Sequence, residues 1–184
     1  MTHTYDSEQV EVLKNAMSTF PPETMRGSWN HPDSLTKISD SGTRQVYAHE
    51  DVPDYVVKTA TESGTWANES EIEISTQGTR GNGDFVVPDV AMDHIAHVVE
   101  YDHGPNDADW IIMERADMDS ATEEGAKEIW SDLRDVGWGV SDLHMDNVGV
   151  MDGDPVLVDY VYLKPISEML PKPRRRVESG KRWE

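Results

Sequence analysis

The sequence of 184 residues predicts an α+β fold, on two observations. Short apolar segments separated by turn residues fill most of the first two thirds of the chain, as expected of strands. A helix-like segment and a hairpin signal follow them. Strands that are segregated from helices in this way are typical of α+β architecture. A chain of this length buries roughly two thirds of its unfolded surface, so it can form a core without disulfides or a structural metal.

The first predicted element is a helix over residues 7–19. Its apolar side chains, Val10, Leu13 and Met17, recur at helical spacing and form one face. Ser7 stands at the N-cap position, where a hydroxyl accepts from exposed backbone amides. The stretch after this helix is rich in proline and glycine and is expected to be a loop.

Strands and one further helix are predicted for the central part of the chain. The strand segments alternate apolar and polar residues or form short apolar runs, and aspartate, glycine and proline separate them. In chain order, the predictions are strands at 35–39, 45–49 and 55–60, a helix at 66–77, and strands at 85–92, 96–102 and 109–117.

The last third contains a second long helix and a hairpin. The helix is predicted over residues 122–137, with Thr122 as its N-cap and a glycine at its end. The hairpin has strands at 147–151 and 156–163 around an Asp-Gly turn at 152–154. The residues after it are rich in proline, lysine and arginine and lack apolar periodicity, which predicts a tail outside the fold.

Acidic residues dominate the charge. The chain has 36 Asp and Glu against 16 Lys and Arg, a net charge of −20, and residues 1–171 carry −24 while residues 172–184 carry +4. The acidic part repels nucleic-acid phosphates, so a nucleic-acid partner is expected only through the basic tail. An Asp-rich, Lys-poor surface is typical of a salt-saturated cytoplasm. A halophilic archaeon or a virus infecting one is the expected source, and an ordinary acidic protein is the alternative.

Composition also excludes several classes of protein. No segment approaches the roughly 18 uninterrupted apolar residues of a membrane-spanning helix, so no membrane partner is expected. The first residues lack the basic and apolar regions of a signal peptide. The absence of cysteine excludes disulfides, thiolate metal sites and a cysteine nucleophile. A cytoplasmic location is expected.

One loop carries the most informative pattern. The segment Val-Ser-Asp-Leu-His-Met-Asp-Asn follows the predicted helix 122–137 and contains Asp142 and Asn147, and Asp159 lies twelve residues after Asn147. Phosphoryl transfer needs a carboxylate that accepts a hydroxyl proton, and an amide and a second carboxylate that hold Mg²⁺. The alternative for Asp142 and Asn147 is that they only shape a turn. A structural role is expected for His144.

This loop resembles the catalytic loop of the protein-kinase-like family, in particular its aminoglycoside-phosphotransferase branch and its small viral members. The resemblance implies that Asp142 is the catalytic carboxylate and that Asn147 and Asp159 are metal ligands. It implies ATP and Mg²⁺ as cofactors and a two-lobed fold with an antiparallel sheet in the N-terminal lobe. Because only 25 residues follow Asp159, a strongly shortened C-terminal lobe and a truncated viral (haloarchaeal virus or phage) member are expected.

The N-terminal half resembles the same family in the same order. The turn around Gly42 resembles the loop that covers the phosphates, where glycine permits close approach of the backbone. Lys58 is at the position of the lysine that holds the α- and β-phosphates. Glu71 is at the position of the catalytic-site glutamate that pairs with this lysine, and Glu69 and Glu73 are its alternatives.

The strand at 109–117 resembles the one that leads into the hinge, so the backbone near Glu114 and Ala116 is expected to hold the adenine. The implied organisation is an N-terminal helix and loop extension at 1–34, an N-lobe-like sheet with one helix and the hinge at 35–117, a minimal C-lobe with a helix, the catalytic loop and a hairpin at 118–165, and a basic tail at 166–184.

Two classes of function follow from these observations. The first is a kinase-like protein that binds Mg-ATP and transfers a phosphoryl group to a small hydroxylated acceptor or to itself. The alternative is a catalytically inactive kinase-like module used for binding or assembly, with a viral or host protein as partner. The complete set of charged catalytic residues favours the first class, and the expected shortening of the C-terminal lobe favours the second.

The acidic excess gives a prediction about salt. Raising KCl from about 0.1 M to about 1 M shortens the Debye length from about 10 Å to about 3 Å, which screens the repulsion among surface carboxylates. We therefore expect the melting temperature, followed by circular dichroism, to rise over this range. A melting temperature that stays flat contradicts the halophilic source and leaves the fold prediction untouched.

Overall fold

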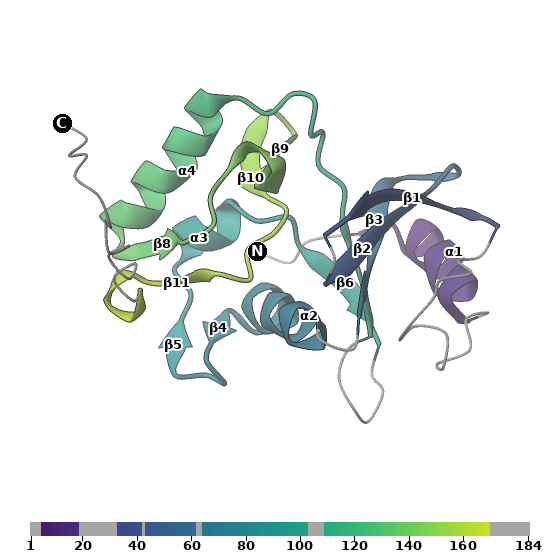
Figure 1. Ribbon diagram of the computed structural model, residues 1–184, viewed down its shortest axis with the longest axis horizontal. Coiled ribbons are helices and arrows are strands. Elements are labelled where there is room, and N and C mark those ends of the chain that lie inside the picture. Colours follow the sequence, from purple (N-terminus) through teal and green to yellow (C-terminus); the bar gives the residue numbers. More distant parts are fainter. Residues whose placement is uncertain (1–4, 19–32, 42, 62–63, 103–108, 170–184) are drawn as a thin grey trace, which may run out of the picture.

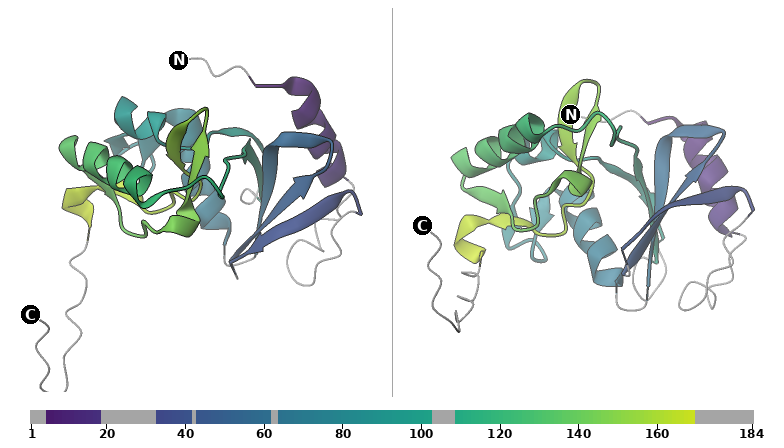
Figure 2. Two further views of the ribbon diagram at one scale, coloured as in Figure 1. Left: turned by 90° about the horizontal axis from the view of Figure 1, so that it is seen from above. Right: turned by 45° about the horizontal axis from the view of Figure 1, so that its top comes forward.

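The computed structural model describes residues 5–18, 33–41, 43–61, 64–102 and 109–169. These residues form two lobes, a five-stranded antiparallel sheet with a helix on each face and a smaller part with one long helix and short hairpins (Figure 1). Both views in Figure 2 show the green and yellow C-terminal part on one side of the sheet and α1 on the other. The predicted two-lobed α+β fold is confirmed.

The sheet is continuous from β1 to β6, in the order β1-β2-β3-β7-β6, and every neighbouring pair is antiparallel. Three of its strands are consecutive hairpin partners, and the other two come after α2 and its following turns. The strands are β1 (Leu35–Asp40), β2 (Arg44–His49), β3 (Val52–Ala60), β6 (Val98–Tyr101) and β7 (Trp110–Glu114). All five predicted sheet segments are therefore confirmed.

The central strand β3 presents a different environment on each face. Because successive side chains of a strand point to opposite faces, Tyr55 and Val57 lie on one side and Val56 and Lys58 on the other. Tyr55 and Val57 belong to the apolar cluster that contains α1. Val56 belongs to the second cluster, which extends through α2 into the C-terminal part. Lys58 therefore enters the space between the sheet, α2 and the C-terminal part.

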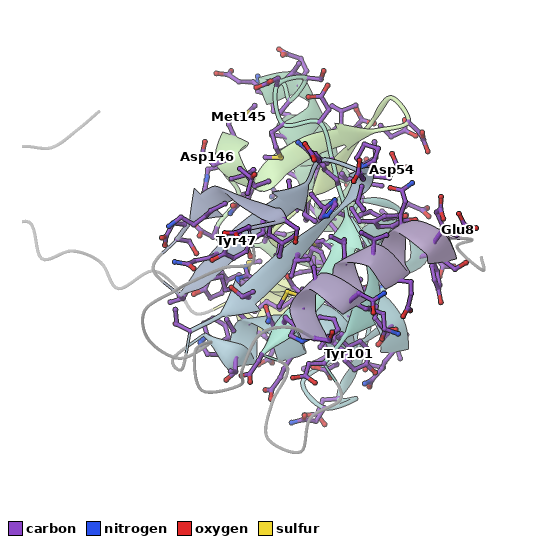
Figure 3. The ribbon with its side chains drawn as sticks, turned by 90° about the vertical axis from the view of Figure 1, so that its right-hand side faces the viewer. Glu8, Tyr47, Asp54, Tyr101, Met145 and Asp146 are labelled. Carbon is purple, nitrogen blue, oxygen red and sulfur yellow. The ribbon has the colours of Figure 1, made fainter. Side chains whose placement is uncertain are left out.

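Helix α1 (Ser7–Ser18) covers the outer face of the sheet. Its three predicted apolar residues, Val10, Leu13 and Met17, are at most 4% exposed and pack in one cluster with Tyr47. Figure 3 shows this helix lying across the sheet, with Glu8 at one end and Tyr47 on the strands beside it. Burial of this stripe explains why the segment is helical, since a short amphipathic helix gains most of its stability from packing.

The predicted N-cap of α1 is wrong by one residue. Asp6, not Ser7, caps the helix, because its Oδ1 accepts from the amides of Glu8 at 2.9 Å and Gln9 at 3.3 Å. A carboxylate at this end also interacts favourably with the helix dipole. The hydrogen bond from the side chain of Gln9, together with those from the two amides, lowers the pKa of Asp6.

Helix α2 (Thr65–Ile72) runs into a π-helical turn, η1 (Glu73–Gln77), and Gly78 ends it with φ of 62°. Together they account for the helix predicted at 66–77. The short strands β4 (Thr79–Arg80) and β5 (Phe85–Val86) follow as a hairpin. The Glu73 carboxylate accepts from two amides in the turn of this hairpin, which ties the turn to the end of the helix.

The strand predicted over 85–92 is wrong. Only its first two residues belong to a strand, and Pro88 is the N-cap of a short helix, α3 (Asp89–Asp93). Proline has no amide to donate to a strand ladder, and its fixed φ suits the start of a helix. Val87 and Ala91 are buried, so the apolar pattern in this segment reflects burial of a turn and a helix rather than a strand.

The C-terminal part is built around α4, the longest helix among the described residues, with 13 residues. Thr122 caps it as predicted, since its Oγ1 accepts from the amide of Gly125 at 3.1 Å. None of the helices in the described residues is both long and apolar enough to cross a membrane. The elements of this part are α4 (Glu123–Asp135), β8 (Trp138–Val140), η2 (Met145–Asn147), β9 (Val148–Met151), β10 (Asp154–Leu157), β11 (Leu163–Pro165) and η3 (Ile166–Glu168).

The predicted hairpin is present but its second strand is shorter than predicted. Strands β9 and β10 pair around Asp152 and Gly153, whose φ values of 53° and 96° suit a tight hairpin turn. The strand predicted to 163 stops at Leu157, opposite the first residue of β9, and the next carbonyl, that of Val158, accepts from Lys58. After a turn, β11 pairs with β8, a strand that the sequence did not predict.

Backbone hydrogen bonds join the two lobes at two points. Ala96 donates to the carbonyl of Leu157 at 3.0 Å, and Leu157 donates to that of His94 at 2.8 Å. Asp117 and Val150 exchange a pair of hydrogen bonds at 2.9 and 3.0 Å. The hairpin β9-β10 is therefore fixed relative to the sheet through its own backbone.

Gly149 on β9 gives a prediction about this junction. A Cβ at this position would lie 2.5 Å from the Cβ of Ala116 and 3.1 Å from the sulfur of Met118. We therefore expect Gly149→Ala to lower the free energy of unfolding by about 1–3 kcal/mol, as overpacking typically does, measured by urea titration.

Gly139→Ala is the matched control, because the atom that it meets most closely, at 2.7 Å, is the flexible end of Met169. It should cost less than the Gly149→Ala substitution. Equal losses for the two variants would contradict a rigid junction at Gly149.

Candidate functional site

A cavity of about 880 Å³ lies between the sheet and the C-terminal part. Strands β1 to β3 form one wall, the loop before β9 and the residues after β10 form the opposite wall, and the connection after β7 closes a third side. Six of the residues predicted for the site line this cavity: Lys58, Glu114, Ala116, Asp142, Asn147 and Asp159. Glu71 lies behind Lys58, and Gly42 lies outside the described residues.

Lys58 and Glu71 form a buried ion pair at the inner end of the cavity. The Nζ of Lys58 lies 3.0 Å from each carboxylate oxygen of Glu71, and the two residues are 5% and 0% exposed. The inward face of β3 supplies the lysine, and the buried face of α2 supplies the glutamate. Of the three glutamates considered from the sequence, Glu71 makes this contact, since Glu69 is exposed and Glu73 binds the β4-β5 turn.

Arg44 is a third member of this cluster and was not predicted as a site residue. Its Nη1 lies 2.9 Å from Glu71 and its Nη2 lies 2.5 Å from Asp159, and the residue is 5% exposed. Side chains alternate between the two faces of a strand, so Arg44 lies on the same face of β2 as Val46, which also lines the cavity. That inward position was the signal in the sequence, because an arginine is rarely fully buried unless it is paired.

Burial and charge act in opposite directions on these groups. For Lys58, burial is the larger influence and lowers the pKa despite the attraction of Glu71. Burial alone would lower the pKa of Arg44 and raise that of Asp159. For Arg44, the attraction of Glu71 and Asp159 outweighs the effect of burial and raises the pKa. For Asp159, the attraction of Arg44 and Lys58 outweighs burial and keeps the pKa below its usual value. Asp159 is thus a carboxylate whose charged form is stabilised by two neighbouring cations, Arg44 and Lys58.

The loop before β9 places Asp142 and Asn147 on the opposite wall. The Nδ2 of Asn147 donates to the carbonyl of Asp142 at 2.9 Å and lies 3.0 Å from the Nε2 of His144. An amide nitrogen only donates, so this Nε2 accepts and the ring of His144 holds Asn147 in place. The carboxylate of Asp142 is exposed at the cavity mouth. His144 therefore has the structural contact expected of it.

These residues fit a magnesium ion through their oxygen atoms. With its Nδ2 engaged, Asn147 has its Oδ1 left, and no hydrogen bond from a described residue engages that oxygen. Asp159 supplies a carboxylate on the same cavity. Among the described residues, no three histidine or acidic side chains cluster closely enough to hold a metal alone. Mg²⁺ commonly takes only one or two protein carboxylates and completes its shell with phosphate and water.

The connection after β7 has one backbone position open to a ligand. The amides of Glu114, Arg115 and Asp117 donate to the carbonyls of His97, Asp54 and Val150, respectively. Within the described ranges, no hydrogen bond engages the backbone of Ala116, which is 8% exposed and lines the cavity. Ala116 is therefore the residue of this segment whose amide and carbonyl remain for a bound group.

The outer rim of the cavity is acidic. Asp117 and Asp119 lie on the connection after β7, and Asp142 and Asp146 lie on the opposite loop, all four of them exposed. Figure 3 labels Asp146 on this loop, next to Met145. The exposed Arg115 also lines the cavity beside Asp117, so the rim is acidic in net charge rather than throughout. The cations Lys58 and Arg44 lie deeper, at the buried end.

The comparisons with known proteins add similarity of backbone. No protein-family model matches the sequence, and no curated protein matches it. Similar solved structures include WbdD in complex with a kinase inhibitor (18% identity, TM-score 0.47, 70% of this chain and 33% of that chain), Cex1p (16%, 0.44, 74% and 28%) and the kinase domain of M. tuberculosis PknI (16%, 0.38, 71% and 59%). The chain spans about a third of the length of WbdD.

The parts follow the order expected from the sequence: a five-stranded antiparallel sheet, a helix that pairs with β3 through Lys58 and Glu71, a connecting segment and a short helical lobe. Identities of 16–18% and TM-scores of 0.38–0.47 are a distant similarity of backbone. The chemistry of the cavity depends on the side chains of this chain.

Glu71 gives a prediction about the buried cluster. Glu71→Gln leaves Lys58 and Arg44 buried with Asp159 as their remaining carboxylate, and breaking a buried ion pair from one side typically costs about 3–5 kcal/mol. We expect a loss of this size in the free energy of unfolding, measured by urea titration.

Glu69→Gln is the matched control on the exposed face of the same helix. It should change stability by no more than about 0.5 kcal/mol, as is usual for surface positions. Similar values for the two variants would show that the cluster is not a determinant of stability.

Proposed function

We propose that this chain binds Mg-ATP in the cavity and transfers a phosphoryl group to a small hydroxylated acceptor or to a hydroxyl of its own. The observation that carries this proposal is the meeting of the buried Lys58–Glu71 pair with Asp142, Asn147 and Asp159 on one cavity. Phosphoryl transfer depends mainly on positioning and on charge stabilisation, and these groups are suited to both.

The nucleotide would lie with its base at the connection after β7 and its phosphates at Lys58. Apolar side chains on the cavity wall, among them Val46, Val56 and Met113, suit the faces of an aromatic base. The open backbone of Ala116 would pair with its edge. Lys58, held by Glu71, would donate to phosphate oxygens at the inner end.

Asn147 and Asp159 would hold Mg²⁺, through the free amide oxygen of one and the carboxylate of the other. When bound, this ion neutralises part of the charge of the phosphates and of the transferring group. The hydrogen bond from Asn147 to the carbonyl of Asp142 links the metal ligand to the catalytic loop, so the two side chains keep a fixed relation.

Asp142 would accept the proton of the acceptor hydroxyl. The oxygen of that hydroxyl would attack the γ-phosphorus of ATP, and ADP would leave. Its exposure at the cavity mouth leaves room for this acceptor. The residues directly after Asp159 support a small acceptor, because Tyr160, Val161 and Leu163 are buried and none of residues 160–169 lines the cavity. The entrance is thus open to a small molecule or to a mobile hydroxyl.

The test is ATP binding by isothermal titration calorimetry in Mg²⁺ at physiological and at molar KCl. Lys58→Ala should weaken binding by about tenfold or more, since a hydrogen bond to a charged group is worth about 1.5–3 kcal/mol. Lys37→Ala, which removes an exposed lysine of β1 outside the cavity, should leave the affinity unchanged. Asp159→Ala should make the ATP affinities in Mg²⁺ and in EDTA alike, because it removes a carboxylate ligand of the metal.

Transfer itself is followed with γ-labelled ATP, as label on the chain or as released phosphate. Asp142→Ala should abolish it while leaving ATP affinity within about threefold, because this carboxylate acts on the acceptor. Wild-type protein that binds no ATP at either salt concentration would overturn the proposal. The chain would then be a kinase-like fold without nucleotide chemistry.

A further inference from the structure

We propose that Arg44 competes with Mg²⁺ for Asp159, and that Arg44 thereby sets how strongly ATP binding depends on the metal. This inference rests on the proposed function for the nucleotide and deepens it. Arg44 is the first residue of β2, and its guanidinium reaches across the cavity floor to a carboxylate on the opposite lobe. The position in front of Asp159 that a metal would take is thus held by a cation of the chain.

The contact is strong enough to compete. The Nη2 of Arg44 lies 2.5 Å from the Oδ2 of Asp159, and its Nη1 lies 2.9 Å from Glu71. A hydrogen bond between two charged groups is among the stronger ones in proteins, and a guanidinium that holds two carboxylates has a fixed geometry. Water screens the contact with Glu71 little, since both side chains are buried, and screens the contact with Asp159 only in part, because the Asp159 side chain is 34% exposed. A metal ion must displace this partner to use Oδ2.

The charges at the cavity floor also favour competition between Arg44 and a divalent cation. Arg44 and Lys58 supply two positive charges, and Glu71 and Asp159 supply two negative charges, all within one set of contacts. A divalent cation added to this set would leave an excess of two positive charges in a largely buried site. The excess is removed if Arg44 leaves Asp159 or if phosphate enters with the metal.

A consequence is that the wild-type protein has little affinity for the metal by itself. The absence of a metal-holding cluster of acidic and histidine side chains among the described residues agrees with this. When ATP enters, Arg44 lies close enough to the cavity to turn from Asp159 toward a phosphate oxygen, since it lines the same space as Lys58. Arg44 then supplies part of the positive charge that Mg²⁺ would otherwise provide.

The first experiment uses Mn²⁺ alone as the probe and electron paramagnetic resonance of the free ion as the readout. Arg44→Gln removes the charge and retains much of the side chain, so Mn²⁺ should bind at least about tenfold more tightly than to the wild type, through the freed Asp159. Arg44→Gln combined with Asp159→Asn should return the affinity to the wild-type level or below. Equal Mn²⁺ affinity in wild type and Arg44→Gln overturns the inference.

The second experiment compares the Kd for ATP in EDTA with that in Mg²⁺. This ratio should stay below about threefold in the wild type and exceed about tenfold in Arg44→Gln, while Asp159→Asn brings it close to one. Arg80→Gln is the matched control, because Arg80 is partly buried, donates to the carbonyl of Val161 at 2.8 Å and does not line the cavity. Arg80→Gln should keep the wild-type ratio of the two Kd values. If Arg44→Gln also keeps the wild-type ratio, competition between Arg44 and Mg²⁺ is contradicted.

Circular dichroism shows whether Arg44→Gln folds. If it does not, Arg44→Lys takes its place, because a single ammonium keeps the charge and cannot hold both carboxylates as a guanidinium does. Mn²⁺ affinity should then rise above the wild-type value, and an unchanged value overturns the inference.

The two proposals fail in distinguishable ways. Absence of ATP binding contradicts the proposed function, whereas the Mn²⁺ comparison decides the competition without any nucleotide.

Discussion

The buried contact between Lys58 and Glu71 is the interaction on which the rest of the site depends. It joins the central strand of the sheet to α2, and Glu71 also holds Arg44, which in turn reaches Asp159 on the other lobe. Lys58 adds a hydrogen bond to the carbonyl of Val158 beside that aspartate. Removing charges from water is costly, so each member of this set is tolerable only while its partners are present.

The two lobes are held at a fixed separation by contacts of a different kind. Backbone hydrogen bonds at Ala96–Leu157 and Asp117–Val150 join the lobes at two places, and the hydroxyl of Tyr160 donates to the carbonyl of Ala96 at 2.9 Å. Tyr160 is fully buried, and burial raises its pKa well above the usual value. The spacing of the two lobes is therefore set by backbone contacts and by a buried phenol, rather than by flexible surface side chains.

The sequence predicted the parts of this structure that local patterns determine. Alternation on β3, the face of α1 and the Asp-Gly turn gave the sheet, the outer helix and the hairpin, and the spacing from Asp142 to Asp159 identified residues that meet on one cavity. Their roles stay predictions.

What the sequence did not predict depends on tertiary contacts. The strand from 156 ends early, and the carbonyl of Val158 just beyond it accepts from Lys58, a residue one hundred positions away. Arg44 was missed although alternation along β2 places it on the inner face, because its two carboxylate partners, Glu71 and Asp159, lie far from it in the sequence. The helix α3 was missed because a short apolar run has the same sequence pattern in a buried strand and in a buried turn that leads into a helix.

The acidic rim of the cavity has a consequence for the rate at which an anion arrives. Four exposed aspartates at the mouth outnumber the exposed Arg115 beside them, while Lys58 and Arg44 lie on the floor and are already balanced by Glu71 and Asp159. A free polyphosphate therefore diffuses toward the site against the field of the protein, and dissolved salt, which weakens that field, speeds its approach. Chelation of a divalent cation lowers the charge of the incoming molecule and has the same effect on its encounter with the mouth.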